Sequence, residues 1–374
     1  MALTDSGRIP TGVLVQALSA DLGDALVTPE ARETIVDLAR ALPDVACSIG
    51  FECALAAGDD RLDLGVSVTP ASGGALALAG ATADPVLQQA VALDPRWARL
   101  QRFAQHWCQP GAPLCARIPF LFLEFDGAGP RQPVPIPSVF AAFDWQLDEL
   151  AAGNRGATTS LGLAHARQLL ELLRDGSVAS PDDGTLTRCF EQLPPGGLVL
   201  HVAAMLGRPR SAARLSVSLP RAVATHYLRD LGWDTSVSQL DAEIAALAGA
   251  AHFDHPAARV QLDFDVLELG GRVGLTLQPR NASSWPALVA RVQHQGRCDP
   301  ERGAATLAWP GLRAAWLPGT STPCVLSRYM MHLKLSLLGG RGPEVKAYFG
   351  GRSVSTPRRS QRAASPVDTG VETG

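Results

Sequence analysis

The stretch Cys47–Leu55, with the sequence CSIGFECAL, alternates apolar residues with small or polar ones. Successive side chains of a β-strand point to opposite faces. Ile49, Phe51 and Leu55 are therefore expected to meet a layer of helices, whereas Ser48 and Glu52 face the other way. The stretch predicts a strand with one apolar face and one polar face.

The same alternation recurs in most of the later strand-like segments. Their apolar positions hold mainly Leu, Val and Phe. The positions between them hold the polar residues Arg61, Asp63, Ser67, Arg214, Ser216, Ser218, Gln261, Asp263, Asp265, Arg272, Thr276, Gln278, His332, Lys334, Ser336, Lys346 and Tyr348.

Five times along the chain, two amphipathic helical segments precede two such strands. The hairpin turns fall near Gly58, Pro130, Arg208, Gly270 and Arg341, so neighbouring turns are roughly 72, 78, 62 and 71 residues apart. We expect an α+β fold in which five ααββ repeats form a ten-stranded antiparallel barrel, with a polar lumen and surrounding helices. An open sheet with helices on one face would give the same alternation. Closure is favoured because the repeat is regular and a closed sheet has no exposed edge.

Length and composition predict one domain over residues 1–351 and a disordered tail over 352–374, where Ser, Arg, Pro, Thr and Gly dominate. Residues 127–137 predict a proline-rich loop. The net charge of -3 argues against a nucleic-acid partner, and no apolar run approaches the roughly 20 residues of a membrane span. Seven cysteines without paired spacing predict free thiols and a cytoplasmic protein. We expect a monomer.

Short motifs add a resemblance to a known family. Gly50–Ala54 is followed by Asp60–Arg61 and Val68–Pro70, and Lys346–Tyr348 has the form Lys-x-Tyr. With the five repeats, these motifs resemble the aromatic prenyltransferases, also called ABBA or PT-barrel enzymes. That family includes the indole prenyltransferases and the cyanobactin peptide prenyltransferases.

The resemblance implies transfer of an allylic group from its diphosphate to an electron-rich aromatic ring of a small molecule or a peptide. It gives Glu52 the role of acceptor-binding residue or base, and it assigns Arg61, Lys346 and Tyr348 to the diphosphate. The family shields its diphosphate site with several tyrosines, whereas this chain has only Tyr227, in a predicted helix, Tyr329, at a strand entrance, and Tyr348. The candidate substitutes are Phe120, Phe122, His201, Met205 and His332.

Transfer of an allylic group from a diphosphate to an aromatic ring requires residues of these types. Fixed cations stabilise the leaving diphosphate, and Arg61, Arg214, Lys334 and Lys346 fall on predicted lumen faces, with Arg272 at the rim. A carboxylate at Glu52 could accept a hydrogen bond from an indole N–H and later take the ring proton. The alternatives are strand-end salt bridges for the cations, and an ion pair between Glu52 and Arg61 across their hairpin.

The lumen is also predicted to be acidic, with Asp63, Glu124, Asp263 and Asp265. These carboxylates, with His201, could hold Mg²⁺, and they leave two other functions open: peptide tailoring that uses lumen carboxylates or a metal, and a non-catalytic binding barrel. The Asp59–Asp63 segment spells Asp-Asp-x-x-Asp, but it lies in a predicted hairpin rather than on a helix. His252 and His255 lie in a predicted loop without further spaced ligands.

Overall fold

The computed structural model describes residues 9–127, 134–144, 155–174, 182–208, 213–251, 253, 255, 258–266, 271–279, 281–318, 320, 323–337 and 342–354. The described residues contain eleven strands of one antiparallel sheet. They are β1 (Ser48–Ala54), β2 (Leu62–Val68), β3 (Leu121–Phe125), β4 (Ser138–Ala142), β5 (Leu198–Ala204), β6 (Ala213–Pro220), β7 (Arg259–Asp265), β8 (Val273–Leu277), β9 (Gly311–Ala315), β10 (Cys324–Leu337) and β11 (Glu344–Val354).

Ten of these strands close into a barrel. The sheet runs in the order β11-β1-β2-β3-β4-β5-β6-β7-β8-β10, and β10 pairs back onto β11. The prediction of a ten-stranded closed barrel is confirmed, and the open-sheet alternative is wrong. The sequence reading missed β9, which extends the sheet beside β10, outside the closed ring.

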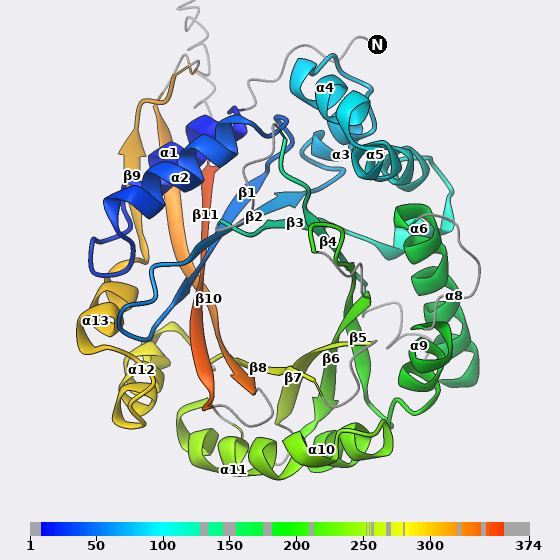
Figure 1. The fold of residues 1–374 in the computed structure, drawn as a ribbon, viewed down its shortest axis with the longest axis vertical. Helices are drawn as coiled ribbons and strands as arrows, with labels where there is room; N and C mark the ends of the chain where they lie inside the picture. Colours follow the sequence, from blue (N-terminus) through cyan, green and yellow to red (C-terminus); the bar gives the residue numbers. More distant parts are fainter. Residues whose placement is uncertain are drawn as a thin grey trace, which may run out of the picture.

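Helices surround the barrel in groups that precede successive strand pairs (Figure 1). They are α1 (Thr11–Ser19), α2 (Pro29–Arg40), α3 (Gly74–Leu78), α4 (Pro85–Leu93), α5 (Pro95–Trp107), α6 (Pro113–Arg117), α8 (Arg155–Leu173), α9 (Asp182–Glu191), α10 (Arg221–Asp230), α11 (Asp234–Ala251), the 3-10 turn Ala282–Ser284, α12 (Trp285–His294) and α13 (Pro300–Ala308). The order matches the five predicted repeats, with the short helices α3 and α6 added to the second.

Several helices begin at a capping residue followed by proline. The side chains of Thr28, Asp84 and Asp299 accept hydrogen bonds from backbone N–H groups in the first turns of α2, α4 and α13. The next residue is proline in each case, whose missing N–H costs nothing at the first helical position. These local signals fix where the helices start, and hence how each helical pair precedes its hairpin.

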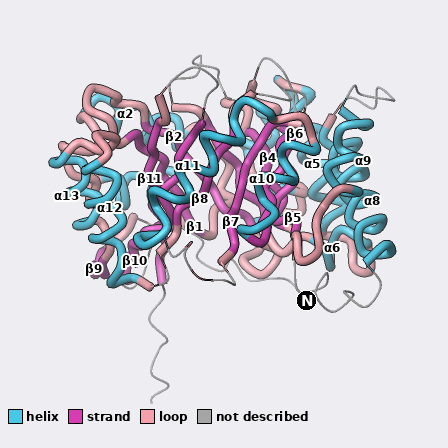
Figure 2. The backbone as a smooth tube through the Cα atoms, turned by 90° about the horizontal axis from the view of Figure 1, so that it is seen from below, coloured by secondary structure: helices cyan, strands magenta, loops and turns pink. Residues whose placement is uncertain are grey.

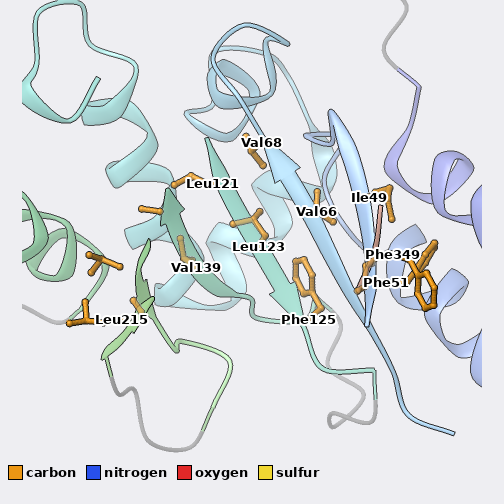
Figure 3. Packing of buried hydrophobic residues seen from close by; sticks show 14 of the residues in the cluster. Ile49, Phe51, Val66, Val68, Leu121, Leu123, Phe125, Val139, Leu215 and Phe349 are labelled. Atoms are coloured by element: carbon orange, nitrogen blue, oxygen red, sulfur yellow. The ribbon is translucent and has the colours of Figure 1, made fainter. Parts of the chain in front are cut away.

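The hydrophobic core lies between the barrel and the helices, not inside the barrel. Ile49, Phe51, Leu123 and Phe349 point outward and are buried under the helices (Figure 3). Trp309 packs edge-on against Phe51, with ring centroids 6.1 Å apart. Because the apolar face of each strand is used in this outer layer, the polar face is left to line the lumen.

Some local expectations change. β11 continues to Val354, so the tail predicted from Arg352 starts too early. The pairing of Arg352–Val354 with β10 is made by the backbone and does not require bulky apolar side chains. Tyr329 lies inside β10 rather than at its entrance. The predicted turn positions Pro130, Gly270 and Arg341 lie outside the described residues.

The remaining expectations about the chain concern its thiols, its polar segments and its helices. All seven cysteines are unpaired. Part of the 127–137 loop, residues from 355 onward, and His252 lie outside the described residues. Among the helices that the structure describes, none combines the length and apolar character needed to cross a membrane.

Candidate active site

Two cavities follow one another along the barrel lumen. The larger, of about 360 Å³, is lined mainly by ionisable side chains and is called the charged cavity. The smaller, of about 130 Å³, contains Phe122, Phe140, His201 and His332 and is called the aromatic cavity. A single layer of side chains lines both: Glu52, Asp63, Glu124, Asp263, Lys334 and Tyr348.

The charged cavity opens toward the hairpin loops. Arg61, Asp126, Arg208 and Arg272 line it, and each lies at or just beyond the hairpin end of a strand. The aromatic cavity extends the other way, past Gly50 and Gly65. These two glycines face each other across β1 and β2 and carry no side chain into the lumen, which leaves space there.

Glu52 of the shared layer forms an ion pair with Lys346, which lines the charged cavity. The Lys346 Nζ lies 2.5 Å from the Glu52 Oε1 and 3.9 Å from the Asp63 Oδ2. Burial favours the neutral carboxyl, but the charge and hydrogen bond of Lys346, with a hydrogen bond from Tyr348, hold the pKa of Glu52 below its usual value. Glu52 is therefore a carboxylate, and the predicted alternative of a hairpin ion pair with Arg61 is not formed.

Lys334 makes the matching pair on the neighbouring strand. Its Nζ lies 2.9 Å from the Asp263 Oδ2, and Lys334 stands directly opposite Lys346 in the β10–β11 register. A Cβ on Gly274 would lie 2.5 Å from the Lys334 Cε, so a larger residue at this position would displace the end of the Lys334 side chain. Lys334 and Lys346 are the only lysines in the chain.

Arginines provide the other lumen cations. Arg214 makes two hydrogen bonds to Asp265, of 2.7 and 3.1 Å. Arg208 lies 3.2 Å from Glu124 and 3.7 Å from Asp126. At the hairpin end of the cavity, two further arginines share one carboxylate.

That carboxylate is Glu344, which contacts Arg61 at 2.5 Å and Arg272 at 3.2 Å. Arg61 also pairs with Asp59 and has a half-exposed side chain. Arg61 therefore lies at the mouth of the charged cavity rather than deep in the lumen, and Arg272 lies at the rim as expected.

Two lumen carboxyls have raised pKa values. Burial, with the nearby charge of Glu52, raises the pKa of Glu124 to about 7 despite Arg208. The same two causes raise the pKa of Asp63 to about 6. At Asp263, in contrast, the effect of burial is outweighed by the charges of Lys334 and Arg214, which hold the pKa below its usual value. Near neutral pH, the shared layer therefore contains carboxyls that change charge readily.

Rings form the wall of the aromatic cavity. The His332 and Tyr348 rings stack with centroids 4.3 Å apart, and the Lys334 Nζ lies 5.8 Å from the Tyr348 ring. Phe122 faces Phe140 across the β3–β4 pair. Burial lowers the pKa values of His201 and His332 to about 4, so both imidazoles are neutral. The cavity offers π faces beside a layer of charges.

Most of the predicted site residues meet in the lumen, with three differences. Met205 is buried just past the end of β5 and lines neither cavity, because the strand ends before its alternation reaches that residue. Asp265 lines neither cavity and acts on the lumen only through Arg214. Phe120 lies before β3, where its ring packs on Phe122.

The sequence reading gave no binding role to Arg208, Asp126 or Phe140. Arg208 and Asp126 lie in hairpin loops, where period-two alternation says nothing about direction. Phe140 lies in the short strand β4, and its facing residue Phe122 was the available signal. In the described part of the chain, no three His, Cys, Asp or Glu side chains cluster as a metal site would require.

Solved structures share this architecture across nearly the whole chain. The prenyltransferase PriB matches with a TM-score of 0.51 and 15% identity, covering 91% of this chain and 95% of its own. The chain has the fold of the aromatic prenyltransferases, the PT barrel. A second PT barrel, NotF in complex with brevianamide F and DMSPP, matches with a TM-score of 0.53 and 12% identity, covering 95% and 98%.

A third PT barrel is 5-dimethylallyl tryptophan synthase from Streptomyces coelicolor, in complex with DMASPP and Trp. It matches with a TM-score of 0.50 and 16% identity over 90% of this chain and 93% of its own. No protein-family model and no curated protein matches the sequence.

Proposed function

We propose that this protein is a prenyltransferase that moves an allylic group from its diphosphate to an electron-rich, indole-like ring of a small molecule or a peptide. The observation that carries the proposal is the succession of a cation-rich cavity and an aromatic cavity that share one layer of side chains. An allylic diphosphate has the same two parts, an anionic head and an apolar, cation-forming tail.

Six cations line the charged cavity: Arg61, Arg208, Arg214, Arg272, Lys334 and Lys346. The carboxylates that line it are Glu52, Asp63, Glu124, Asp126 and Asp263. If Glu124 and Asp63 take up protons, which their raised pKa values favour, six of the lining side chains are positive and three are negative. Three carboxylates outside this lining, Asp59, Asp265 and Glu344, pair with Arg61, Arg214 and Arg272. The guanidinium and ammonium groups along this lining can donate charge-assisted hydrogen bonds to a multiply charged anion.

The reaction would proceed at the shared layer. The allylic C–O bond breaks, and its electron pair leaves with the diphosphate, which the lumen cations stabilise. A ring carbon of the acceptor then supplies the electron pair for the new C–C bond. Glu52, which is charged and lies between the two cavities, would accept a hydrogen bond from the ring N–H and then take the ring proton.

The aromatic wall would protect the allylic cation from water. Tyr348, Phe122 and Phe140 present π faces, which attract cations, and the neutral imidazoles of His201 and His332 add no repelling charge. These rings would take the part that the family's additional tyrosines play. The neighbours support the substrate class by their names, since PriB was solved with L-tryptophan and dimethylallyl thiolodiphosphate.

The direct test observes the two lysines. Since Lys334 and Lys346 are the only lysines, protein labelled with ¹³C at lysine Cε should give two methylene environments by NMR, both in the lumen. Inorganic pyrophosphate and dimethylallyl diphosphate should move both signals, and mass spectrometry should detect prenylated L-tryptophan or a tryptophan peptide. Signals unmoved by either anion at millimolar concentration would contradict the proposal.

The Mg²⁺ prediction is tested in the same assay. In the proposed reaction, side-chain cations bind the diphosphate without a metal ion. Turnover in excess EDTA should therefore equal turnover with added Mg²⁺. A metal requirement would instead favour the second candidate, a peptide-tailoring reaction that uses the lumen carboxylates. The raised pKa of Glu124 supports this second candidate, because a carboxyl that titrates near 7 suits general acid–base catalysis. Retention of an unchanged ligand would favour a binding barrel.

A further inference from the structure

The last strands extend beyond the closed part of the barrel. β10 and β11 contain 14 and 11 residues, and β9 pairs with the first five residues of β10. Together they form a three-stranded sheet at the end of the barrel opposite the hairpin loops (Figure 2). Its two faces have different surroundings.

One face packs against the N-terminal helix α1 and the loop after it. Leu326 is fully buried in the core, and Gly351 lies against Leu18. Arg313 and Arg328 both pair with Asp21, at 3.0 and 3.4 Å. This face is therefore covered by the protein itself.

The opposite face is exposed and mostly apolar, with Ser327 and Arg352 as its polar side chains. Leu312 is 74% exposed and Trp316 is 71% exposed, the highest values among the large hydrophobic residues of the described chain. The register places Leu312, Ser327 and Arg352 in one row, and Ala314, Val325 and Val354 in the next. We call this face the apolar apron: Leu312, Ala314, Trp316, Val325, Tyr329 and Val354.

The apron continues into the aromatic cavity. Tyr329 faces Gly350 across β10 and β11, and the next pair on the same face is His332 with Tyr348. A register shift between Met330 and His332 keeps Tyr329 and His332 on one face although they are three residues apart. A chain that leaves the aromatic cavity at this end would therefore run onto the apron.

We propose that the apron binds the extended segment that flanks the modified residue of a peptide acceptor; this rests on the proposed function. Val354 is six positions beyond Tyr348, which is about 20 Å along a strand, or about six residues of an extended peptide. A free amino acid cannot span that length, so the apron contributes only to peptides. Within the described residues β9 pairs on one side only, so its other edge can accept a further strand.

The test uses fluorescein-labelled peptides with one tryptophan and a flank of one, three, six or nine alternating Val and Thr residues, on either side. Fluorescence anisotropy gives the affinity without requiring turnover. For one orientation, we expect the affinity to rise at least about 10-fold up to six flanking residues and then level off. N-methylation of alternate amides on one edge of the flank should remove the gain, whereas N-methylation on the other edge should not.

Trp316→Ala and Leu312→Ser should each remove most of that gain and leave the one-residue peptide unaffected. Leu93→Ser is the matched control, since Leu93 is 59% exposed at the end of α4, in another helical group. Affinity that is independent of flank length, or equally reduced by the control, would overturn the inference. A dimer that Trp316→Ala dissociates, without any length dependence, would assign the apron to a second copy and also overturn it.

Failure of the proposed function gives a different result. In that case pyrophosphate would leave both lysine signals unmoved. The dependence of peptide affinity on flank length is measured separately, by anisotropy, and tests only the apron.

Discussion

Replacing Lys346 with methionine removes one ammonium from the lumen and keeps an unbranched side chain of similar length. In the protein this ammonium lies 2.5 Å from Glu52, and the Lys346 side chain is only 10% exposed. Loss of one partner of a buried ion pair costs up to about 3–5 kcal/mol of unfolding free energy if the other partner stays charged. Asp63, 3.9 Å from the ammonium, loses a weaker contact.

Protonation of Glu52 should limit that cost. Burial by itself would raise the pKa of Glu52, and Lys346 is the main group that holds it below its usual value. In Lys346→Met we therefore expect the pKa of Glu52 to lie above its usual value. The folded state then binds more protons than the unfolded state between the two pKa values, so the variant should lose stability, relative to the parent, as the pH rises through that interval.

The affinity for a diphosphate should fall with the lost charge. A charge-assisted hydrogen bond contributes about 1.5–3 kcal/mol, which corresponds to about 10–150-fold in the dissociation constant. Calorimetric titration with inorganic pyrophosphate, on protein shown to be folded by its melting curve, measures this. The control is Arg40→Met, which removes a cation from the exposed face of α2, where Arg40 pairs with Asp37. A folded Lys346→Met variant that binds pyrophosphate within about two-fold of the parent would refute the assignment of the charged cavity.

Three further substitutions test the shared layer. Glu52→Gln should keep the affinity for pyrophosphate and lower turnover of the aromatic acceptor by about 10²–10⁴-fold, the range for loss of one general base. Glu124→Gln should reduce the rise in pyrophosphate affinity between pH 8 and pH 6, because protonation of a carboxyl with a pKa of about 7 contributes to that rise in the parent. The same variant should gain up to about 3 kcal/mol of unfolding free energy at pH 8, since the raised pKa costs stability as pH rises from about 4.5 to 7. Gly274→Ala should cost about 1–3 kcal/mol and move the Lys334 NMR signal more than that of Lys346, because the new Cβ would lie 2.5 Å from the Lys334 Cε.

Each of these expectations has a contrary result. Normal turnover with a lowered melting temperature in Glu52→Gln would make that carboxylate a structural partner of Lys346. An unchanged pH profile in Glu124→Gln would remove that carboxyl from anion binding. An alanine at 274 that leaves both lysine signals in place would mean that the backbone yields and the glycine is not needed.

The strands and their lumen faces could be predicted from the sequence alone. Alternation between apolar and polar residues is a local property, because successive side chains point to opposite faces wherever the strand lies. It was therefore sufficient to assign Glu52, Asp263, Lys334 and Lys346 to the lumen. In the structure, the first three line both cavities and Lys346 lines the charged cavity. The regular recurrence of the five repeats likewise predicted closure, because a closed sheet has no exposed edge.

The partners of those side chains were decided by the tertiary structure. Glu52 and Arg61 are neighbours in sequence, yet Glu52 pairs with Lys346, 294 positions away, because β11 closes the barrel against β1. Arg61 instead forms ion pairs with Asp59 and Glu344 at the mouth of the charged cavity. Alternation predicts which face of the sheet a side chain lies on. It does not predict how far along the barrel axis the side chain lies, or which residue of a sequence-distant strand lies beside it. Those follow from the register between strands, which long-range packing of the whole barrel sets.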